Sequence, residues 1–351
     1  LGLSVESFPL STDSPESLTT DVVYLGEPNA PLLFVIVSGT HGVEGYAGAA
    51  CQLAFLRAYV QQFANLQDVG FLLIHAANPW GFHHDRRVTQ EGVDLNRNFV
   101  DFARPAPVNA GYARYHSWLI ADQTSGWARL RDNLRVLGDL SSRRRRLCFQ
   151  EAITQGQYSY PDGLFYGGAA PTENRRILEH IFARYLPRRQ LRLMLDLHTG
   201  LGKRGAGEAL SHLDTGTADY RQLSAWLAGR LSSVAHGQAI SSRVSGTLVQ
   251  AFDNFDDARS FALVLEFGTA KPWQVLQALR REQQMHRRPH CFPKREHEEI
   301  RKRMRAAFYI DDARWKNSVL CYFDEVLSAL LHGTLGALAT QTYRQSAGQW
   351  T

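Results

Sequence analysis

The chain has 351 residues and a mass of 39.5 kDa, and its proportions of hydrophobic (44%), charged (21%) and aromatic (11%) residues are those of an ordinary globular protein. They exclude a disordered, collagen-like or fibrous chain, and the longest apolar run, Leu32 to Val37, is far shorter than the roughly 20 residues of a transmembrane helix. The net charge of +5 is concentrated between Arg280 and Arg305, where ten Lys or Arg stand against four Glu, so the rest of the chain is close to neutral.

The hydrophobic pattern alternates short apolar runs with helical periods, which predicts an α/β protein with a parallel or mixed sheet. Buried strands are predicted where a run is apolar on both faces, at residues 32–38, 71–76, 191–197 and 261–267. Helices are predicted at residues 44–62, 174–185, 219–233 and 296–331, and at 109–155 with a basic break at Arg143 to Arg146. We expect one domain over residues 1–351, with functional side chains just after the four strands.

The first predicted strand leads into an HxxE turn formed by His41 and Glu44, and Glu44 opens the next helix. Three residues of separation at such a turn can bring an imidazole and a carboxylate onto one centre, and both ligand types suit Zn²⁺. A histidine at a strand end can equally be a structural residue. The motif alone leaves both interpretations open.

An arginine-rich stretch follows the second predicted strand. It runs from NPWGF (78–82) through Arg86 and Arg87 to GVDLNRNF (92–99). Its guanidinium groups could bind a substrate carboxylate or polarise a carbonyl group. The alternative is a solvated loop whose arginines form surface ion pairs.

The third and fourth predicted strands each end in a residue suited to chemistry. His198 ends the third strand, and Asp196 lies two residues earlier on the same side, where it could orient a metal ligand. Two His and one Glu would leave the fourth position of a tetrahedral zinc ion open to water. Glu266 lies in an apolar run, where a carboxylate must be paired, bound to metal or raised in pKa, and a raised pKa suits a general base. A salt-bridged Glu at the strand end is the alternative.

Taken in order, the motifs HGVEG (41–45), NPWGF, GVDLNRNF, DLHTG (196–200) and LEFGT (265–269) resemble the M14 zinc carboxypeptidase superfamily. They resemble most closely its bacterial branch of unknown function, DUF2817. The motifs lie between residues 38 and 269, about two-thirds of the chain. The resemblance implies a three-layer α/β/α sandwich around a mixed, mainly eight-stranded sheet, with one zinc ion per chain at the strand ends.

The resemblance also implies roles for particular residues. The zinc ligands of the family are matched by His41, Glu44 and His198. Glu266 matches its general base, and Arg87 matches the arginine that polarises the scissile carbonyl, with Arg86 as an adjacent rival. Asn96 and Arg97 match the pair that binds the terminal carboxylate of the substrate. The implied reaction is hydrolysis of an amide bond next to a free carboxylate.

Three functions remain open. The first is a metallocarboxypeptidase acting on a peptide, which the complete Asn96-Arg97-Asn98-Phe99 favours. The second is an N-acyl amino acid amidohydrolase of the aspartoacylase or succinylglutamate desuccinylase type, which SGTHGVEG (38–45) resembles at least as well. The third is a catalytically silent binding module.

The tyrosine of the resembled peptidases has no clear counterpart. Those enzymes usually place a tyrosine on a loop between the third ligand and the base, where this chain has only Tyr220, within a predicted helix. Tyr166 is a candidate replacement from another loop, and a packing role fits Tyr166 equally well.

Two further patterns are interpreted as decoys. The GxGxxG pattern at residues 200–205 has no helix directly after it, so we interpret it as an active-site loop and not as a nucleotide-binding turn. A second metal cluster at His286, His290, Cys291 and His297 is disfavoured because Pro289 and Pro293 interrupt the spacing.

The remaining sequence features concern location and partners. The basic helical segment at residues 280–305 lacks interleaved aromatic residues, so we expect a solvated helical face and no nucleic-acid partner. Four widely spaced cysteines without a CxxC pair, together with a start that is unlike a signal peptide, predict a cytoplasmic protein with no membrane partner. The oligomeric state is not predicted.

Overall fold

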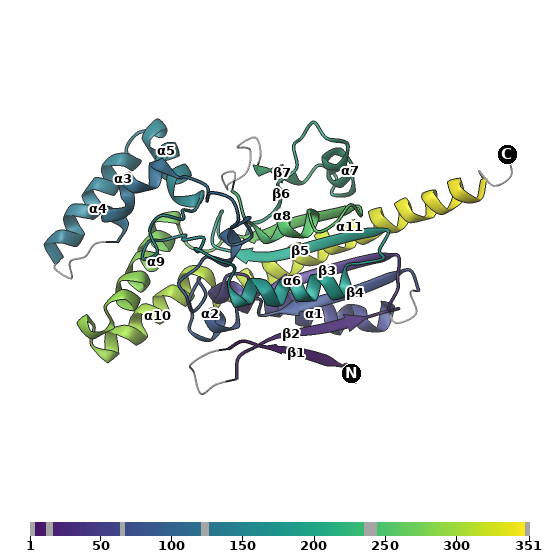
Figure 1. Cartoon of the computed structure of the whole chain (residues 1–351), viewed down its shortest axis with the longest axis horizontal. Coiled ribbons are helices and arrows are strands. Elements are labelled where there is room, and N and C mark those ends of the chain that lie inside the picture. Colours follow the sequence, from purple (N-terminus) through teal and green to yellow (C-terminus); the bar gives the residue numbers. More distant parts are fainter. Residues whose placement is uncertain (1–3, 12–16, 64–66, 121–125, 235–243, 348–351) are drawn as a thin grey trace.

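The computed structural model describes residues 4–11, 17–63, 67–120, 126–234 and 244–347. Eight strands form one mixed sheet in the order β1-β2-β4-β3-β5-β8-β6-β7, with helices on both of its faces (Figure 1). The strands are β1 (Val5–Pro9), β2 (Thr19–Leu25), β3 (Leu32–Ser38), β4 (Val69–His75), β5 (Leu191–Thr199), β6 (Gly207–Ser211), β7 (Leu231–Ser233) and β8 (Ser260–Phe267). This arrangement confirms the expected α/β class and the mixed, eight-stranded sheet.

The four strands predicted from the sequence are the central strands β4, β3, β5 and β8, and their bounds agree to within two residues. These four strands run parallel to one another. The outer strands β2 and β6 pair with them in the antiparallel sense. Because parallel strands bring their carboxyl ends to one edge, the residues after β3, β5 and β8 meet there.

Eleven α-helices lie within the described residues. They are α1 (Gly45–Phe63), α2 (Pro79–His83), α3 (Ala110–Leu119), α4 (Gly126–Leu140), α5 (Arg143–Thr154), α6 (Glu173–Tyr185), α7 (Ala218–Trp226), α8 (Leu248–Asp253), α9 (Pro272–Arg287), α10 (Lys294–Phe308) and α11 (Ala313–Ala347). Helices α1 and α6 confirm two of the predicted helices. No helix in these ranges combines the length and the apolar character needed to cross a bilayer.

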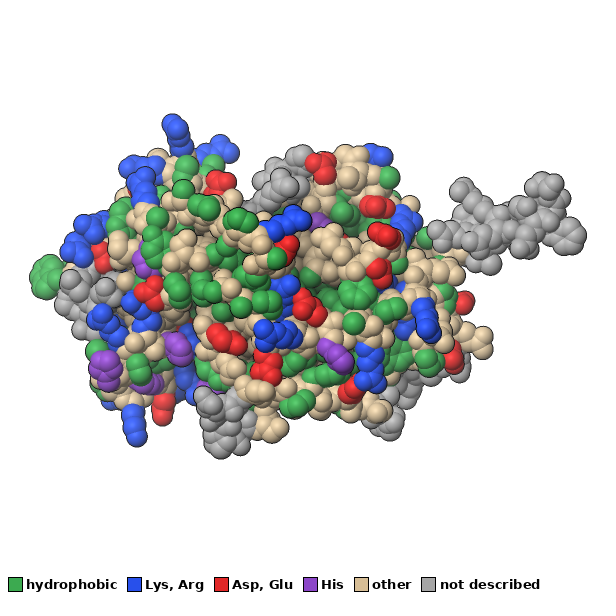
Figure 2. Space-filling model, viewed as in Figure 1, with side chains coloured by type: hydrophobic (Ala, Val, Ile, Leu, Met, Phe, Trp, Pro, Cys, Tyr) green, Lys and Arg blue, Asp and Glu red, His purple; other side chains and the backbone are tan. Residues whose placement is uncertain are grey.

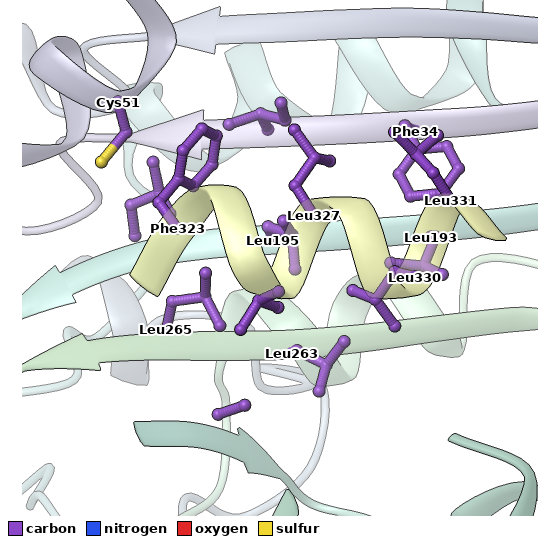
Figure 3. Close-up of a cluster of buried hydrophobic side chains, with 14 of the residues drawn as sticks. Phe34, Cys51, Leu193, Leu195, Leu263, Leu265, Phe323, Leu327, Leu330 and Leu331 are labelled. Atoms are coloured by element: carbon purple, nitrogen blue, oxygen red, sulfur yellow. The ribbon is translucent and has the colours of Figure 1, made fainter. Parts of the chain in front are cut away.

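Alternate residues of the central strands fill two separate cores, which makes the molecule a three-layer α/β/α sandwich. In β3, Leu32, Phe34 and Ile36 face a core shared with α1, α7 and α11, whereas Leu33, Val35 and Val37 face a core shared with α6 and α8. Figure 3 shows the first core, in which leucines of α11 lie over β3, β5 and β8. Burial of each such leucine stabilises the fold by about 1.5–3 kcal/mol.

A third core lies beyond the carboxyl ends of the central strands. It joins α3, α4, α5, α9 and α10, which we call the helical end of the molecule (Figure 1). Arg280 of α9 is buried here, and it donates hydrogen bonds to the backbone oxygens of Trp118 and Leu119 and to Oδ1 of Asn133. These bonds fix α9 against the carboxyl-terminal end of α3 and the middle of α4.

Three predicted helices have different bounds in the structure. The helix expected at residues 219–233 ends at Trp226, because Ala228 and Gly229 adopt positive φ angles and the chain then enters β7. The helix expected at residues 296–331 is divided into α10 and α11. Asp312 caps the start of α11, because its Oδ1 accepts hydrogen bonds from the backbone N–H groups of Arg314 and Trp315. The region 109–155 forms three helices.

The basic break expected at Arg143 to Arg146 is also wrong. These arginines form the first turn of α5, and Ser142 caps that helix by accepting a hydrogen bond from the backbone N–H of Arg145. The basic segment at residues 280–305 is not one solvated helix. It contains the end of α9, a turn with two prolines and most of α10, and Arg280 within it is buried.

Candidate active site

His41 and Glu44 follow β3 directly. Gly39 adopts a positive φ of 72°, which turns the chain away from the sheet. A short 3₁₀ helix, Gly42–Glu44, then leads into α1. A Cβ on Gly42 would lie 2.0 Å from the backbone of Gly81, so only glycine allows α2 to approach this turn so closely. The turn places Glu44 Oε1 2.9 Å from Nδ1 of His41, and both side chains are buried.

His198 reaches the same point from the end of β5. Its Nδ1 lies 3.1 Å from Nδ1 of His41 and 3.1 Å from Oε2 of Glu44. Each of the three residues offers a ligand atom, and these atoms lie within 4.8 Å of one another. The structure therefore brings together the three residues that the sequence suggested as zinc ligands, and no other such group occurs in the part of the chain it describes.

The outer nitrogens of both imidazole rings are held by aspartates. Nε2 of His198 lies 2.6 Å from Oδ2 of Asp196, and Nε2 of His41 lies 3.1 Å from Oδ1 of Asp94. Because an ionised carboxylate only accepts hydrogen bonds, each Nε2 carries the hydrogen and each Nδ1 keeps its lone pair. Carboxylates placed in this way orient metal-bound histidines in known metal sites.

This donor set fits a zinc ion. Two Nδ1 lone pairs and the carboxylate of Glu44 converge on one buried point, where they repel one another unless a cation or a proton lies between them. Two histidines and one carboxylate are a common ligand set for catalytic zinc, which keeps a further position open.

The charges of the cluster stabilise its ionised carboxylates. Burial alone would raise the pKa of Glu44, but positive charge on His41 and His198, which requires a proton on each Nδ1 in the place that a metal ion would take, lowers that pKa below its usual value. Burial of Asp94 is likewise outweighed by Arg87 and His41, which hold the pKa of Asp94 well below normal. Asp196 and then Glu44 overcome the effect of burial on His198 and raise the pKa of its imidazole.

Glu266 lies beside the cluster on β8, where it occupies the same register position as His198 on β5. Its side chain is buried, and its Oε1 accepts a hydrogen bond of 2.8 Å from the backbone N–H of Leu201. Burial, followed by the negative charge of Glu44, raises the pKa of Glu266 to about 8. A carboxyl group with a pKa near neutrality can accept and release a proton under physiological conditions.

The two neighbouring arginines separate in the structure. Arg87 donates from Nη1 to Glu44 (3.0 Å) and from Nε to Asp94 (3.0 Å), so its guanidinium lies against the ligand cluster. Arg86 is buried elsewhere, where it pairs with Glu282 of α9. The structure therefore brings Arg87 into the site and gives Arg86 a structural position.

Asn96 and Arg97 lie in the 3₁₀ helix Leu95–Arg97, which Asp94 caps through a hydrogen bond from the backbone N–H of Asn96. The Arg97 guanidinium donates to the backbone oxygens of Asn96 and Thr154, both at 2.7 Å. Its Nε is buried without a hydrogen-bond partner, and among the described residues no carboxylate lies within 4.0 Å of it. Such a guanidinium can accommodate an incoming carboxylate.

These residues line one cavity of about 150 Å³, which we call the active-site cavity. His41, Glu44, Arg87, Asn96, Arg97, His198 and Glu266 all contribute to its wall. Sequence reasoning missed several other lining residues, among them Phe165, His212 and Gln250, and it also missed Asp94 behind the wall. Asp94 stands within GVDLNRNF, between the implied site residues Arg87 and Asn96. An acidic residue at this position was the available signal that it contacts the site.

Neither candidate tyrosine lines this cavity. The hydroxyl of Tyr220 donates a hydrogen bond to the backbone oxygen of Leu231. Tyr166 is buried, and it is not among the residues that line the cavity. The glycine pattern at residues 200–205 forms the loop between β5 and β6, and Leu201 of this loop lines the cavity. His286 lies against Trp80, and no second metal cluster is present among the described residues.

Comparison with known proteins gives a family and several similar folds. The profile of the family described as "Protein of unknown function (DUF2817)" matches residues 1–322. A search of curated protein sequences finds no significant match.

Carboxypeptidase A from Helicoverpa armigera is similar at 14% identity and a TM-score of 0.45, over 87% of this chain and 69% of its own. A succinylglutamate desuccinylase/aspartoacylase family protein from Shewanella amazonensis is similar at 15% identity and a TM-score of 0.43, over 94% and 73% of the two chains. Bovine thrombin-activatable fibrinolysis inhibitor is similar at 12% identity and a TM-score of 0.43, over 91% of each chain.

Proposed function

The chain belongs to the DUF2817 family, and we propose that it is a zinc-dependent hydrolase that cleaves an amide bond next to a free carboxylate, in the manner of a metallocarboxypeptidase. The observation that carries this proposal is the convergence of His41, Glu44 and His198, with Glu266 beside them on the next strand. The motif resemblance to the M14 superfamily supports the same reaction class. One zinc ion per chain is part of the proposal.

His41, Glu44 and His198 would hold the zinc ion. When bound, the ion supplies a Lewis acid that polarises a carbonyl group and lowers the pKa of water toward neutrality. Asp94 and Asp196 accept hydrogen bonds from Nε2 of His41 and of His198. Each hydrogen therefore stays on Nε2, and both Nδ1 atoms remain free to bind the ion.

Arg97 and Asn96 would bind the terminal carboxylate of the substrate. The unpartnered Nε of Arg97 offers a buried donor for this purpose. Arg87 would then donate a hydrogen bond to the scissile carbonyl oxygen as negative charge develops on it. Such a donor lowers the activation free energy by about 3–4 kcal/mol. Holding the substrate at two points fixes the amide bond next to Glu266.

Glu266 would accept a proton from the attacking water and deliver it to the amide nitrogen. The C–N bond then breaks, so that one water and one amide give one carboxylic acid and one free amine. The backbone N–H of Leu201 holds the Glu266 carboxylate in position during both transfers.

A second candidate is hydrolysis of an N-acyl amino acid. The active-site cavity, at about 150 Å³, has room for little more than one side chain, which suits a small substrate. Both reactions would use the same residues, so the substrate distinguishes them.

Metal analysis combined with paired substrates tests the proposal. We expect about one zinc per chain, and we expect the protein to hydrolyse an N-acyl peptide. A chelator should abolish this activity, and added zinc should restore it. Faster hydrolysis of the matched N-acyl amino acid would favour the second candidate. A protein that takes up no zinc after metal repletion would contradict both.

A further inference from the structure

A large groove lies at the helical end, separate from the active-site cavity. Its volume is about 1500 Å³, and we call it the basic groove. Helices α4, α9 and α10 line it, together with residues 202–204 and 269–271 of two loops. Nothing in the proposed reaction uses this groove.

Every charged residue in the lining of the basic groove is positive. They are Lys203, Arg204, Lys271, Arg280, Arg281 and Arg303, with no Asp or Glu among the lining residues. Arg204 and Arg281 pair with carboxylates outside the lining. Within the described residues, Lys203 and Lys271 have no acidic partner within 4.0 Å. Two ammonium groups are thus available to an anionic ligand.

The floor of the basic groove is apolar. Ile300 and Ala307 are each 4% exposed, and Trp273 also belongs to the lining. Nε2 of Gln277, also in the lining, is buried without a hydrogen-bond partner, so a donor is present for a ligand oxygen. A ligand that fills this groove must present both apolar and acidic groups.

Helix α4 extends the apolar surface beyond the groove. Trp127, Leu130, Leu134 and Leu137 are 83%, 48%, 59% and 47% exposed, and their spacing places them along one side of the helix. Leu130 belongs both to this stripe and to the groove lining. The combination of an apolar stripe and basic rims suits an amphipathic, acidic peptide.

The basic groove and the active-site cavity share their dividing wall. The loop after β5 gives Leu201 to the cavity and Lys203 to the groove, and α9 gives Leu279 to the cavity and Ala278 to the groove. The Cα atoms of Leu201 and Lys203 are at most about 7 Å apart, so a peptide needs only a few residues to reach from one to the other.

The charge distribution disfavours a second copy of the chain as the occupant. Residues 110–154 and 272–308, which supply the helical end, carry 18 Lys or Arg against eight Asp or Glu, whereas the rest of the chain is acidic overall. Figure 2 shows Lys and Arg side chains gathered over this end. Two such ends would repel each other. A single tryptophan in the floor also falls short of the successive aromatic residues that stack on a nucleic-acid strand.

We propose that the basic groove binds an acidic, partly apolar stretch of the peptide substrate, on the amino-terminal side of the bond that is cleaved. This inference rests on the peptidase form of the proposed function. The active-site cavity holds the last residue, and the chain before it crosses the shared wall into the groove. The substrate class is therefore acidic peptides, selected away from the reacting atoms.

The test compares peptides that share their last residues but carry upstream Glu and Leu, Gln and Leu, or Lys and Leu. We expect the zinc-loaded enzyme to show a KM for the acidic peptide roughly tenfold below that for the neutral one, with similar kcat and with a difference that shrinks as salt rises. The variant Lys203→Glu/Lys271→Glu should lose that difference. The matched control Lys294→Glu/Lys302→Glu changes the same charge on exposed residues of α10 outside the groove, and it should retain the difference.

Binding of the labelled acidic peptide to the full-length Glu266→Gln protein, followed by fluorescence anisotropy, separates the groove from catalysis. Salt-sensitive binding that Lys203→Glu/Lys271→Glu weakens supports the groove even if no peptide is hydrolysed, in which case the proposed function fails alone. Equal hydrolysis of all three peptides overturns the groove and leaves the hydrolase standing. Loss of the acidic preference in the control variant as well, or displacement of the peptide by a lower concentration of single-stranded RNA, also overturns the proposal.

Discussion

Replacing Asp94 by asparagine changes one buried side chain that supports three groups of the site at once. Oδ1 of Asp94 accepts from Nε2 of His41 and from the backbone N–H of Asn96, each at 3.1 Å, and Oδ2 accepts from Nε of Arg87 at 3.0 Å. An asparagine has a single acceptor oxygen. With that oxygen toward His41, its NH₂ group faces the Arg87 donor, and with the oxygen toward Arg87, the NH₂ group faces Nε2 of His41.

The second orientation moves the imidazole hydrogen to Nδ1, where it occupies the lone pair that would bind zinc. The first leaves a charged donor without its partner, which costs about 1.5–3 kcal/mol. Both orientations also remove the negative charge that raises the basicity of the His41 imidazole, so zinc binding should weaken by about 10- to 100-fold, equivalent to about 1.4–2.7 kcal/mol. The loss should exceed that of a surface aspartate variant, for which Asp101→Asn is suitable because Asp101 is exposed and contacts Arg104 and the backbone N–H of Ala103, away from the cluster.

Zinc affinity is measured by competition with a chelator of known affinity, alongside thermal unfolding with and without zinc. The Asp94→Asn protein should be folded and should gain less thermal stability from added zinc than the wild type. An affinity within a factor of two of the wild type would refute the reasoning, since it would show that the carboxylate charge of Asp94 does not strengthen His41 as a ligand.

Three further predictions concern the base, the carboxylate site and a buried acid. Glu266→Gln should retain zinc but lower kcat by about 10²- to 10⁴-fold, because glutamine cannot accept a proton, and turnover near the wild-type rate would exclude Glu266 as the base. Arg97→Ala should chiefly raise KM for substrates with a free terminal carboxylate, and an equal loss on C-terminally amidated substrates would argue against its role. Burial raises the pKa of Asp253 to about 7, so its protonated form is favoured in the folded state and its contribution to stability is lost as pH rises from about 4 to 7, by up to about 4 kcal/mol. The free energy of unfolding, measured with denaturant, should therefore depend less on pH over that range in Asp253→Asn than in the wild type. An unchanged pH dependence would contradict this effect of burial.

The convergence of the candidate metal ligands and the candidate base could be predicted because strong local patterns position these residues. His41, His198 and Glu266 each stand at or just after a run that is apolar on both faces, and such runs form adjacent parallel strands whose ends meet. Pattern alone did not find β1, β2, β6 and β7, since these outer strands are short or half-exposed. Their number was expected only from the resemblance.

The contacts around the ligands depend on loop paths that no local pattern determines. Asp94 reaches His41 across 53 positions of sequence, and Arg86 and Arg87 point to different partners although they are adjacent. Helix ends were missed for a similar reason, because single capping residues such as Ser142 and Asp312 decide where a helix begins. These residues are common elsewhere in the sequence, so their effect becomes visible only with the fold.

The hydrogen bond from Arg97 to the backbone oxygen of Thr154 has a consequence for the modularity of the chain. Thr154 is the last residue of α5 and of the stretch 110–154, which could pass for a dispensable insertion. Its backbone oxygen accepts a hydrogen bond from the Arg97 guanidinium, the group proposed to bind the substrate carboxylate. A truncated chain that joins residue 109 directly to residue 155 would keep the sheet and all three metal-ligand candidates, yet it would release Arg97. Homologues that shorten this insertion are therefore expected to carry a compensating acceptor near Arg97 or to recognise substrates by another group.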